Sequence, residues 1–105
     1  KLVDVKKIQQ VEESAVCREL LLAKVKTDAA TRSQILEISQ IFRAKVVDVS
    51  PEATILELTG KSSKLDGFVT MLMPYGVMEL ARTGVTAIGR GKACIKDETD
   101  YKEKI

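Results

Sequence analysis

The alternation of hydrophobic and polar positions predicts an interior strand and a one-sided helix in the first half of the chain. Residues 18–26, RELLLAKVK, are apolar on both faces at first and then alternate, which is typical of a strand inside a sheet. Residues 29–43 carry apolar side chains at helical spacing, and Thr27 and Asp28 are placed to cap the first turn. The buried arc of this helix is predicted to consist of Ile35, Ile38, Ile41 and Phe42.

The next two apolar segments predict an antiparallel hairpin. Residues 44–49, AKVVDV, are rich in β-branched side chains, and residues 54–59, TILELT, alternate between apolar and polar faces. Between them Pro51 fixes the backbone angle φ and lacks an N–H, which predicts a turn over residues 50–53. The short connection and the similar strand lengths favour antiparallel pairing.

A second helix is predicted to begin near Ser63 and to end before Pro74. Ser63 stands three residues before Asp66, which is the spacing of a Ser-x-x-acid capping pattern. A last strand is predicted over residues 77–83, VMELART. The buried stripe of the helix is predicted to consist of Leu65, Phe68, Val69 and Leu72.

The element order β-α-β-β-α-β predicts a ferredoxin-like α+β domain. Such a domain has a four-stranded antiparallel sheet, and right-handed crossovers place both helices on one face of it. The other face is expected to carry apolar side chains and to serve as a contact surface. The candidates for this face are Leu20, Leu22, Ile55 and Met78.

Three segments fall outside this pattern. Residues 1–17 hold a short strand-like start and the polar stretch QQVEES, which predicts either the last strand of a preceding domain with a linker or a disordered N-terminus. The segment RTGVTAIGRG predicts a glycine-rich turn after the last strand. The highly charged residues 92–105 predict a solvated tail.

Composition narrows the class of protein. A length of 105 residues suits one domain, and 45% hydrophobic with 30% charged residues is ordinary for a globular chain. A net charge of +2 with four aromatic residues gives no reason to expect nucleic acid, and no run is apolar enough to span a membrane. Cys17 and Cys94 are expected to be reduced thiols in a cytoplasmic protein.

The stretch LELTGKSSKLD, residues 56–66, places Gly-Lys-Ser after a strand, as nucleotide-binding loops do. The full pattern requires glycine five positions before that Gly-Lys pair, and Ile55 occupies this position. A phosphate-binding loop is therefore rejected, although Lys61 and Lys64 beside a helix N-terminus could hold an anion weakly.

No catalytic arrangement is apparent, since the chain has no histidine and its acidic residues are scattered. These acidic residues are interpreted as surface charges, which favours a binding or regulatory module. They are Glu19, Asp48, Glu57, Asp66 and Glu79.

Several segments together resemble one family. These are RELLLAKVK, the stretch IFRAKVVDVSPEATILELTGKSSKLDGF and MELARTGVTAIGRG, which lie in this order over residues 18–91. They are similar to the C-terminal domain of the small, regulatory subunit of acetolactate synthase (acetohydroxyacid synthase). The opening KLVDVKKI looks like the last strand of the ACT domain that precedes this domain in the family, which makes residues 1–17 a strand remnant and a linker.

The resemblance implies a non-catalytic subunit. Its expected partner is the catalytic subunit of acetolactate synthase, which it activates in the biosynthesis of valine, leucine and isoleucine. Thiamine diphosphate, magnesium and FAD are expected only on that partner, and no cofactor or metal is expected in this chain. The family's valine-inhibition site lies in the N-terminal ACT domains, so no residue here is assigned to it. A homodimer is also expected.

Arg82 and Arg90 are the candidate partner contacts, because arginine suits interface ion pairs. Solvated charges at a strand end are the alternative for both residues. A different class of function is also open, namely a stand-alone ferredoxin-like sensor that binds an amino acid or an anion at a subunit interface.

Overall fold

The computed structural model describes residues 14–92. The predicted strand remnant at the N-terminus and nearly all of the predicted tail therefore lie outside the described residues. The described residues form two compact units, one of which is Glu19–Val85 and the other residues 14–18 together with residues 86–92. The elements in chain order are β1 (Ala15–Lys26), α2 (Arg32–Phe42), β2 (Lys45–Val49), β3 (Ala53–Gly60), α3 (Ser62–Leu72), the 3-10 helix η1 (Met73–Tyr75), β4 (Val77–Arg82) and β5 (Thr86–Gly89).

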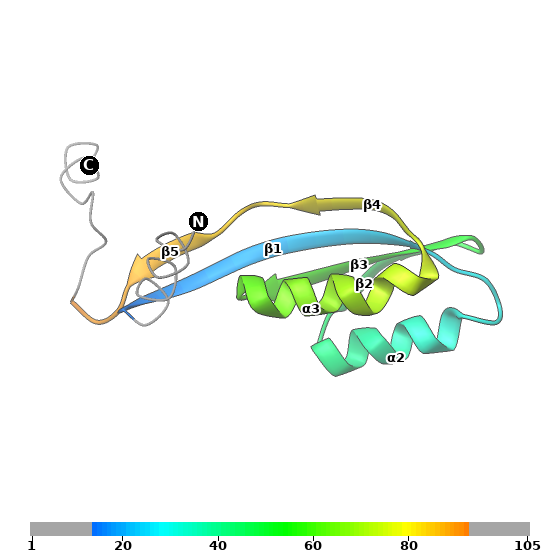
Figure 1. The fold of residues 1–105 in the computed structure, drawn as a ribbon, viewed down its shortest axis with the longest axis horizontal. Coiled ribbons are helices and arrows are strands. Elements are labelled where there is room, and N and C mark those ends of the chain that lie inside the picture. The colour runs from blue at the N-terminus through cyan, green and yellow to red at the C-terminus, as the bar shows by residue number, and fades with distance from the viewer. Residues whose placement is uncertain (1–13, 93–105) are drawn as a thin grey trace. The chain divides into compact units, whose positions relative to one another are not determined.

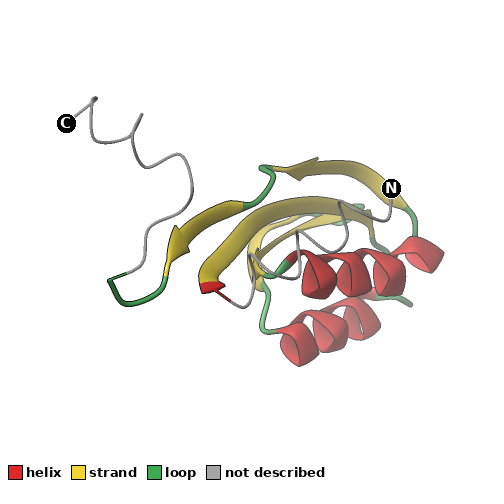
Figure 2. Cartoon of the chain, turned by 60° about the vertical axis from the view of Figure 1, so that its left-hand side comes forward, coloured by secondary structure: helices red, strands yellow, loops and turns green. Residues whose placement is uncertain are grey.

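The predicted ferredoxin-like fold is confirmed in the unit Glu19–Val85. Its strands lie in the order β2-β3-β1-β4, and every neighbouring pair is antiparallel. The helices α2 and α3 lie side by side on one face of this sheet (Figures 1 and 2). We call this the helix-covered face and the opposite one the open face.

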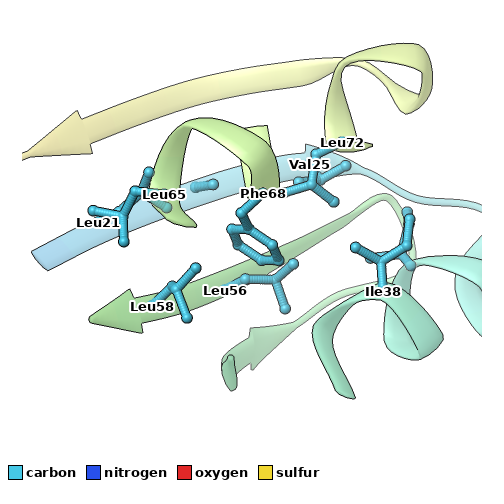
Figure 3. Close-up of a cluster of buried hydrophobic side chains, with 10 residues drawn as sticks. Leu21, Val25, Ile38, Leu56, Leu58, Leu65, Phe68 and Leu72 are labelled. Carbon is cyan, nitrogen blue, oxygen red and sulfur yellow. The ribbon is translucent and has the colours of Figure 1, made fainter. Parts of the chain in front are cut away.

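The core lies between the helix-covered face and the two helices. Along β1 every second residue is buried, and β3 alternates in the same way, so each strand turns one row of side chains toward the helices. Phe68 of α3 is fully buried at the centre of the cluster (Figure 3). Its ring lies 5.1 Å from that of Phe42, centroid to centroid. The buried members are Leu21, Ala23, Val25, Ile35, Ile38, Leu56, Leu58, Leu65, Phe68 and Leu72.

The predicted burial of Leu65, Phe68 and Leu72 in α3 is confirmed, and Val69 is partly buried against the core. One predicted position of α2 is wrong. Ile41 is 70% exposed, although Ile35 and Ile38 are buried and Phe42 packs at the edge of the core. Ile41 comes only three residues after Ile38, at the last turn of a helix that ends at Phe42, where the core no longer reaches it.

Both helices begin differently from the prediction. The predicted capping role of Asp28 is confirmed, because its carboxylate accepts the backbone N–H groups of Ala30 and Thr31, both at 2.9 Å. Residues 29–31 nevertheless form a turn, so α2 begins at Arg32 and not at Ala29. The Thr27 hydroxyl donates instead to the Val25 carbonyl. The helix α3 begins at Ser62, and Lys61 at its N-cap position makes no side-chain capping bond.

A capping role for Ser63 is therefore wrong, because that residue already lies in the first turn of α3. The hydroxyl that does find a partner at this end of the helix belongs to Ser62, and it donates to the carboxylate of Glu19.

The glycine-rich turn predicted after the last strand is also wrong in part. Residues Thr86–Gly89 form β5, which pairs antiparallel with Ala15–Arg18 at the start of β1. Most of this partner segment, residues 15–17, was predicted to be the end of a linker. A strand of four residues that ends in a glycine carries too little pattern to be predicted without knowledge of its partner.

The open face is apolar only in part. Leu20 and Ile55 are half-buried there and Leu22 is 39% exposed, but polar side chains alternate with them. Lys24 and Glu79, for example, form an ion pair of 3.0 Å between β1 and β4. Met78 falls at an irregularity in the β1–β4 register, which removes it from the regular alternation.

Within residues 14–92, no helix is both long and apolar enough to cross a membrane. The same residues contain no group of three or more His, Cys, Asp or Glu side chains that could hold a metal ion.

Candidate functional site

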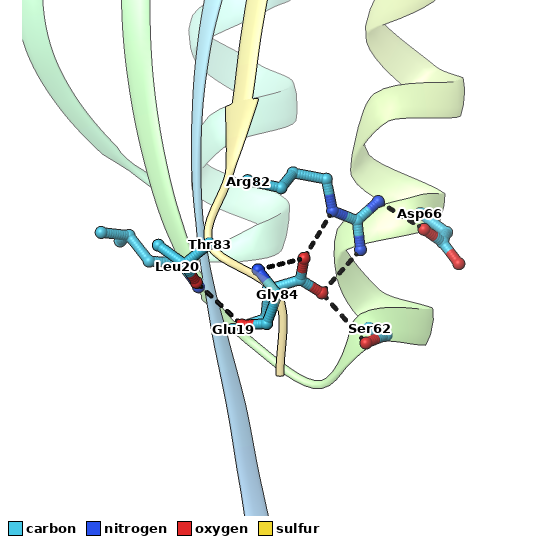
Figure 4. A network of polar contacts seen from close by, with 7 residues as sticks. All are labelled: Glu19, Leu20, Ser62, Asp66, Arg82, Thr83 and Gly84. Atoms are coloured by element: carbon cyan, nitrogen blue, oxygen red, sulfur yellow. Dashed lines mark hydrogen bonds and ion pairs between the residues drawn. The ribbon is translucent and has the colours of Figure 1, made fainter. Parts of the chain in front are cut away.

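The most connected polar group of the unit Glu19–Val85 surrounds the carboxylate of Glu19 (Figure 4). We call it the Glu19 cluster, and it comprises Glu19, Ser62, Asp66, Arg82, Thr83 and Gly84. Three elements supply it, because Glu19 comes from β1, Ser62 and Asp66 from α3, and Arg82 from the end of β4.

Glu19 lies on the helix-covered face, since it shares the alternation of Leu21, Ala23 and Val25. It is only 6% exposed, so its charge requires partners. The interpretation of Glu19 as a surface charge is therefore wrong. The alternation of RELLLAKV could have revealed this, because Glu19 stands an even number of positions from Leu21, Ala23 and Val25.

The Glu19 carboxylate accepts four hydrogen bonds. One oxygen, Oε1, receives Nη2–H of Arg82 at 2.8 Å and the hydroxyl of Ser62 at 3.0 Å. The other, Oε2, receives Nε–H of Arg82 at 2.9 Å and the backbone N–H of Gly84 at 3.2 Å. Two parallel bonds from one guanidinium define both the distance and the orientation of the pair.

Arg82 also contacts a second carboxylate. Its Nη1 donates to Oδ1 of Asp66 at 2.6 Å. The side chain of Arg82 is 27% exposed and that of Asp66 is 65% exposed, so this contact lies at the surface, whereas the contact with the 6% exposed Glu19 is partly buried. Arg82 thus joins the interior of the cluster to its surface.

The two residues after Arg82 attach the end of β4 to β1. The backbone N–H of Thr83 donates to the Leu20 carbonyl, and the Leu20 N–H donates to the Thr83 hydroxyl, both at 3.0 Å. Gly84 has a φ of +84°, a conformation that side chains with a Cβ disfavour. This conformation accompanies the bond from its N–H to Glu19.

The electrostatic effect of the cluster is mutual stabilisation of charge. The hydrogen bonds from Arg82 lower the pKa of Glu19, with smaller contributions from Ser62 and Gly84, and they outweigh the opposing effect of burial. The hydrogen bonds to Glu19 and then to Asp66 raise the pKa of Arg82. Both groups are therefore charged at neutral pH.

The two sequence candidates occupy different units of the chain. Arg82 belongs to the Glu19 cluster, where it is bound by two carboxylates and still partly exposed. Arg90 belongs to the other unit, is exposed, and donates its backbone N–H to the Ser14 carbonyl at 3.1 Å. A partner contact for either residue stays a prediction.

Most of the sequence segments that resemble the small-subunit family meet in this cluster. REL supplies Glu19, ARTG supplies Arg82 with the two residues that follow it, and KSSKLDGF supplies Ser62 and Asp66. Sequence reasoning singled out Arg82 but missed its acidic and hydroxyl partners, because they lie 16 to 63 positions away along the chain.

The stretch that resembled a phosphate-binding loop has a structural role. The Ser62 hydroxyl is engaged by Glu19, and a Cβ on Gly60 would lie 3.1 Å from Cδ of Lys64. The tight turn from β3 into α3 therefore brings the backbone of Gly60 close to the Lys64 side chain.

The arrangement offers no activated nucleophile. The basic partner of Glu19 is a guanidinium, which does not release its proton in proteins, and no histidine exists in the chain. What the cluster can do is hold β1, β4 and α3 in one geometry and present an oriented guanidinium at the surface.

Comparison with known proteins gives one family. A profile described as "Small subunit of acetolactate synthase" matches residues 18–91. The chain is 50% identical to the acetolactate synthase small subunit of Mycolicibacterium smegmatis over 92 residues, which are 87% of this chain and 54% of that protein. It is 45% identical to the small subunit of Bacillus subtilis, with 87% of this chain and 54% of that protein covered.

A solved structure agrees with these relatives. The crystal structure of the acetolactate synthase small subunit from Thermotoga maritima matches with a TM-score of 0.73 at 32% identity, covering 86% of this chain and 65% of that one. The chain spans about half the length of the curated relatives it matches.

Proposed function

Because this chain belongs to the family of acetolactate synthase small subunits, we propose that it docks on the catalytic subunit of that enzyme and raises its activity. Docking shifts the catalytic subunit toward its active conformation, and the chain itself catalyses nothing. The observation that carries the proposal is the match of residues 18–91 to the family.

We assign the docking surface to the open face. No helix of the described residues covers it, and it carries Leu20, Leu22 and Ile55 on the two central strands β1 and β3. Leu22 is central among them, because its Cα partners are Glu57 in β3 and Ala81 in β4. Apolar side chains ringed by polar ones are typical of a surface that meets another protein.

The proposal extends to regulation of the whole subunit. The complete small subunit, in this proposal, confers feedback inhibition by valine, and the thiamine diphosphate, magnesium and FAD belong to the catalytic partner. None of the residues described here is assigned to a valine site.

The test is reconstitution. Purified catalytic subunit is assayed for acetolactate formation with and without this chain, and binding is measured by analytical ultracentrifugation. We expect complex formation and higher activity. Absence of both at micromolar concentrations would refute the proposal, and a thermal shift of this chain alone with valine, leucine or isoleucine would favour a stand-alone sensor.

A pair of variants tests the surface. Leu22→Asp is expected to weaken binding by about tenfold or more, because it places a charge in an apolar contact. Ile41→Asp is the matched control, since Ile41 is 70% exposed on α2 and lies outside the open face. Equal binding by the two variants, with both folded by circular dichroism, would exclude the open face.

A further inference from the structure

We propose that the guanidinium of Arg82 is a receptor for an acidic side chain of the docking partner, and that Asp66 occupies this receptor in the free chain. The inference rests on the proposed function and goes beyond it, because it names the chemistry of one contact and an internal competitor for it. Arg82 points toward the helix-covered face, but it ends β4, the edge strand of the order β2-β3-β1-β4, so a partner on the open face reaches it around this edge. A partner carboxylate would replace Asp66 while Arg82 stays anchored on Glu19.

The two carboxylates hold Arg82 very unequally. Glu19 is 6% exposed and accepts four hydrogen bonds, two of them from Nε and Nη2 of Arg82. Asp66 is 65% exposed, and its carboxylate makes one contact, to Nη1. An exposed ion pair contributes little because water solvates both charges, whereas a buried pair is costly to separate. Of the two carboxylates bound to Arg82, only that of Asp66 is therefore expected to be replaced by a carboxylate of the partner.

The guanidinium has donors to spare for a new ligand. It carries five N–H bonds, and the hydrogen bonds among the described residues use three of them, one each on Nε, Nη1 and Nη2. Because the bonds to Glu19 orient the plane of the group, its outer edge is presented to a ligand without further ordering of the side chain. A carboxylate could therefore bind this edge in the bidentate mode that arginine favours.

The neighbouring charges favour an anionic ligand. Lys61 and Lys64 are exposed around the start of α3, next to Ser62 of the cluster. Without Asp66 in contact, Arg82 keeps one carboxylate partner, that of Glu19, and its Nη1 donor becomes available to an anion. A partner that is a protein supplies this anion as an aspartate or a glutamate.

The decisive variant is Asp66→Asn, which keeps the shape of the side chain but removes the competing charge. We expect the dissociation constant of the complex with the purified catalytic subunit to fall by about threefold to fivefold, the size of effect typical of an exposed pair. Glu37→Gln is the control, because Glu37 is an exposed carboxylate on α2 outside the cluster. Arg82→Lys is expected to weaken binding by about tenfold, since lysine cannot hold Glu19 and a second carboxylate in the same fork.

The outcomes separate this inference from the proposed function. No binding by the wild-type chain would refute the proposed function. Binding by the wild-type chain with no gain for Asp66→Asn over Glu37→Gln would refute the receptor and leave docking intact. Weaker binding by Asp66→Asn would also refute it, because Asp66 would then be a partner contact itself.

A second measurement does not need the partner. Nitrogen-detected NMR of the Arg82 side chain is followed while sodium acetate is added to wild type and to Asp66→Asn, with sodium chloride as the ionic-strength control. We expect acetate to shift the Arg82 signals of Asp66→Asn at severalfold lower concentration than those of wild type. Identical titrations, or no acetate-specific shift in either protein, would overturn the proposal.

Discussion

Replacing Glu19 by glutamine removes the charge at the centre of the cluster with almost no change in volume. In the wild type the carboxylate accepts four hydrogen bonds, from Arg82, Ser62 and Gly84. In the variant one of the two oxygens is replaced by an amide NH₂ group, which cannot accept the hydrogen bonds that these donors offer. A hydrogen bond to a charged group contributes roughly 1.5–3 kcal/mol, and breaking a fully buried ion pair costs roughly 3–5 kcal/mol. Arg82 is 27% exposed and keeps Asp66, so the lower range applies. We expect a loss of about 2 kcal/mol in the free energy of unfolding at pH 7.

The assay is urea unfolding followed by circular dichroism, with the same chain length for every variant. A loss of this size corresponds to a fall in Tm of roughly 10 °C for a domain of this length. Glu79→Gln is the matched control, because Glu79 is in an exposed ion pair with Lys24 and is 74% exposed. The free energy of unfolding of Glu79→Gln is expected to fall by less than about 0.5 kcal/mol.

The pH dependence of unfolding is an independent test that the ionised carboxylate of Glu19 stabilises the fold. Hydrogen bonds from Arg82 lower the pKa of Glu19 in the folded state, so the unfolded chain binds this proton more readily. The stabilisation is therefore complete above the unfolded pKa of about 4.3 and is lost as the pH falls through the folded value. The difference between wild type and Glu19→Gln should shrink from pH 7 to pH 3. A loss at pH 7 no larger than that of Glu79→Gln, or a difference that does not change with pH, would refute the buried-pair reasoning.

Three further substitutions test the fold around the cluster by thermal and urea unfolding. Gly67→Ala is expected to stabilise the chain by about 0.5–1 kcal/mol, because a helix interior favours alanine and the new Cβ would lie 3.7 Å from Phe42, an ordinary contact. A loss of stability would contradict the packing of α2 against α3. Gly84→Ala should lower the free energy of unfolding by about 1 kcal/mol, because residues with a Cβ disfavour the φ of +84° even though the space around the new Cβ is open. An unchanged free energy of unfolding would show that the turn can relax. Phe68→Ala should cost about 3–5 kcal/mol, because Phe68 is fully buried, and a loss below about 1 kcal/mol would place it outside the core.

Helices and strands were predictable wherever hydrophobic and polar residues alternated with a regular period along the whole segment. The strands around Leu21 and Leu56 and the helix around Phe68 were all expected, because apolar residues repeat there over eight or more positions. At the helix starts the prediction was right only in part, because Asp28 accepts backbone N–H groups as expected but over a turn that precedes α2, and the hydroxyl of Ser62 makes a tertiary contact. A propensity for capping does not decide which donor or acceptor a side chain finally meets.

The candidate site was only half predictable for the same reason. Arg82 was singled out from the sequence, and the even spacing from Glu19 to Leu21 was a usable signal of burial that the scattered acidic residues obscured. The pairing of Glu19 with Arg82 spans 63 positions and depends on β1 lying beside β4. Without an expected sheet register, no local pattern identifies such a pair.

The sequence by itself determined the class of fold, the buried rows of β1, β3 and α3, and the likeness to the small-subunit family, because these depend on local period and on residue order. Only the tertiary structure decided which groups neutralise Glu19, that Arg82 is shared between two carboxylates, and that Thr86–Gly89 forms β5 on Ala15–Arg18. The physical reason is that the burial of a charge and the pairing of a short strand both depend on partners distant in sequence, which only the folded chain brings into contact.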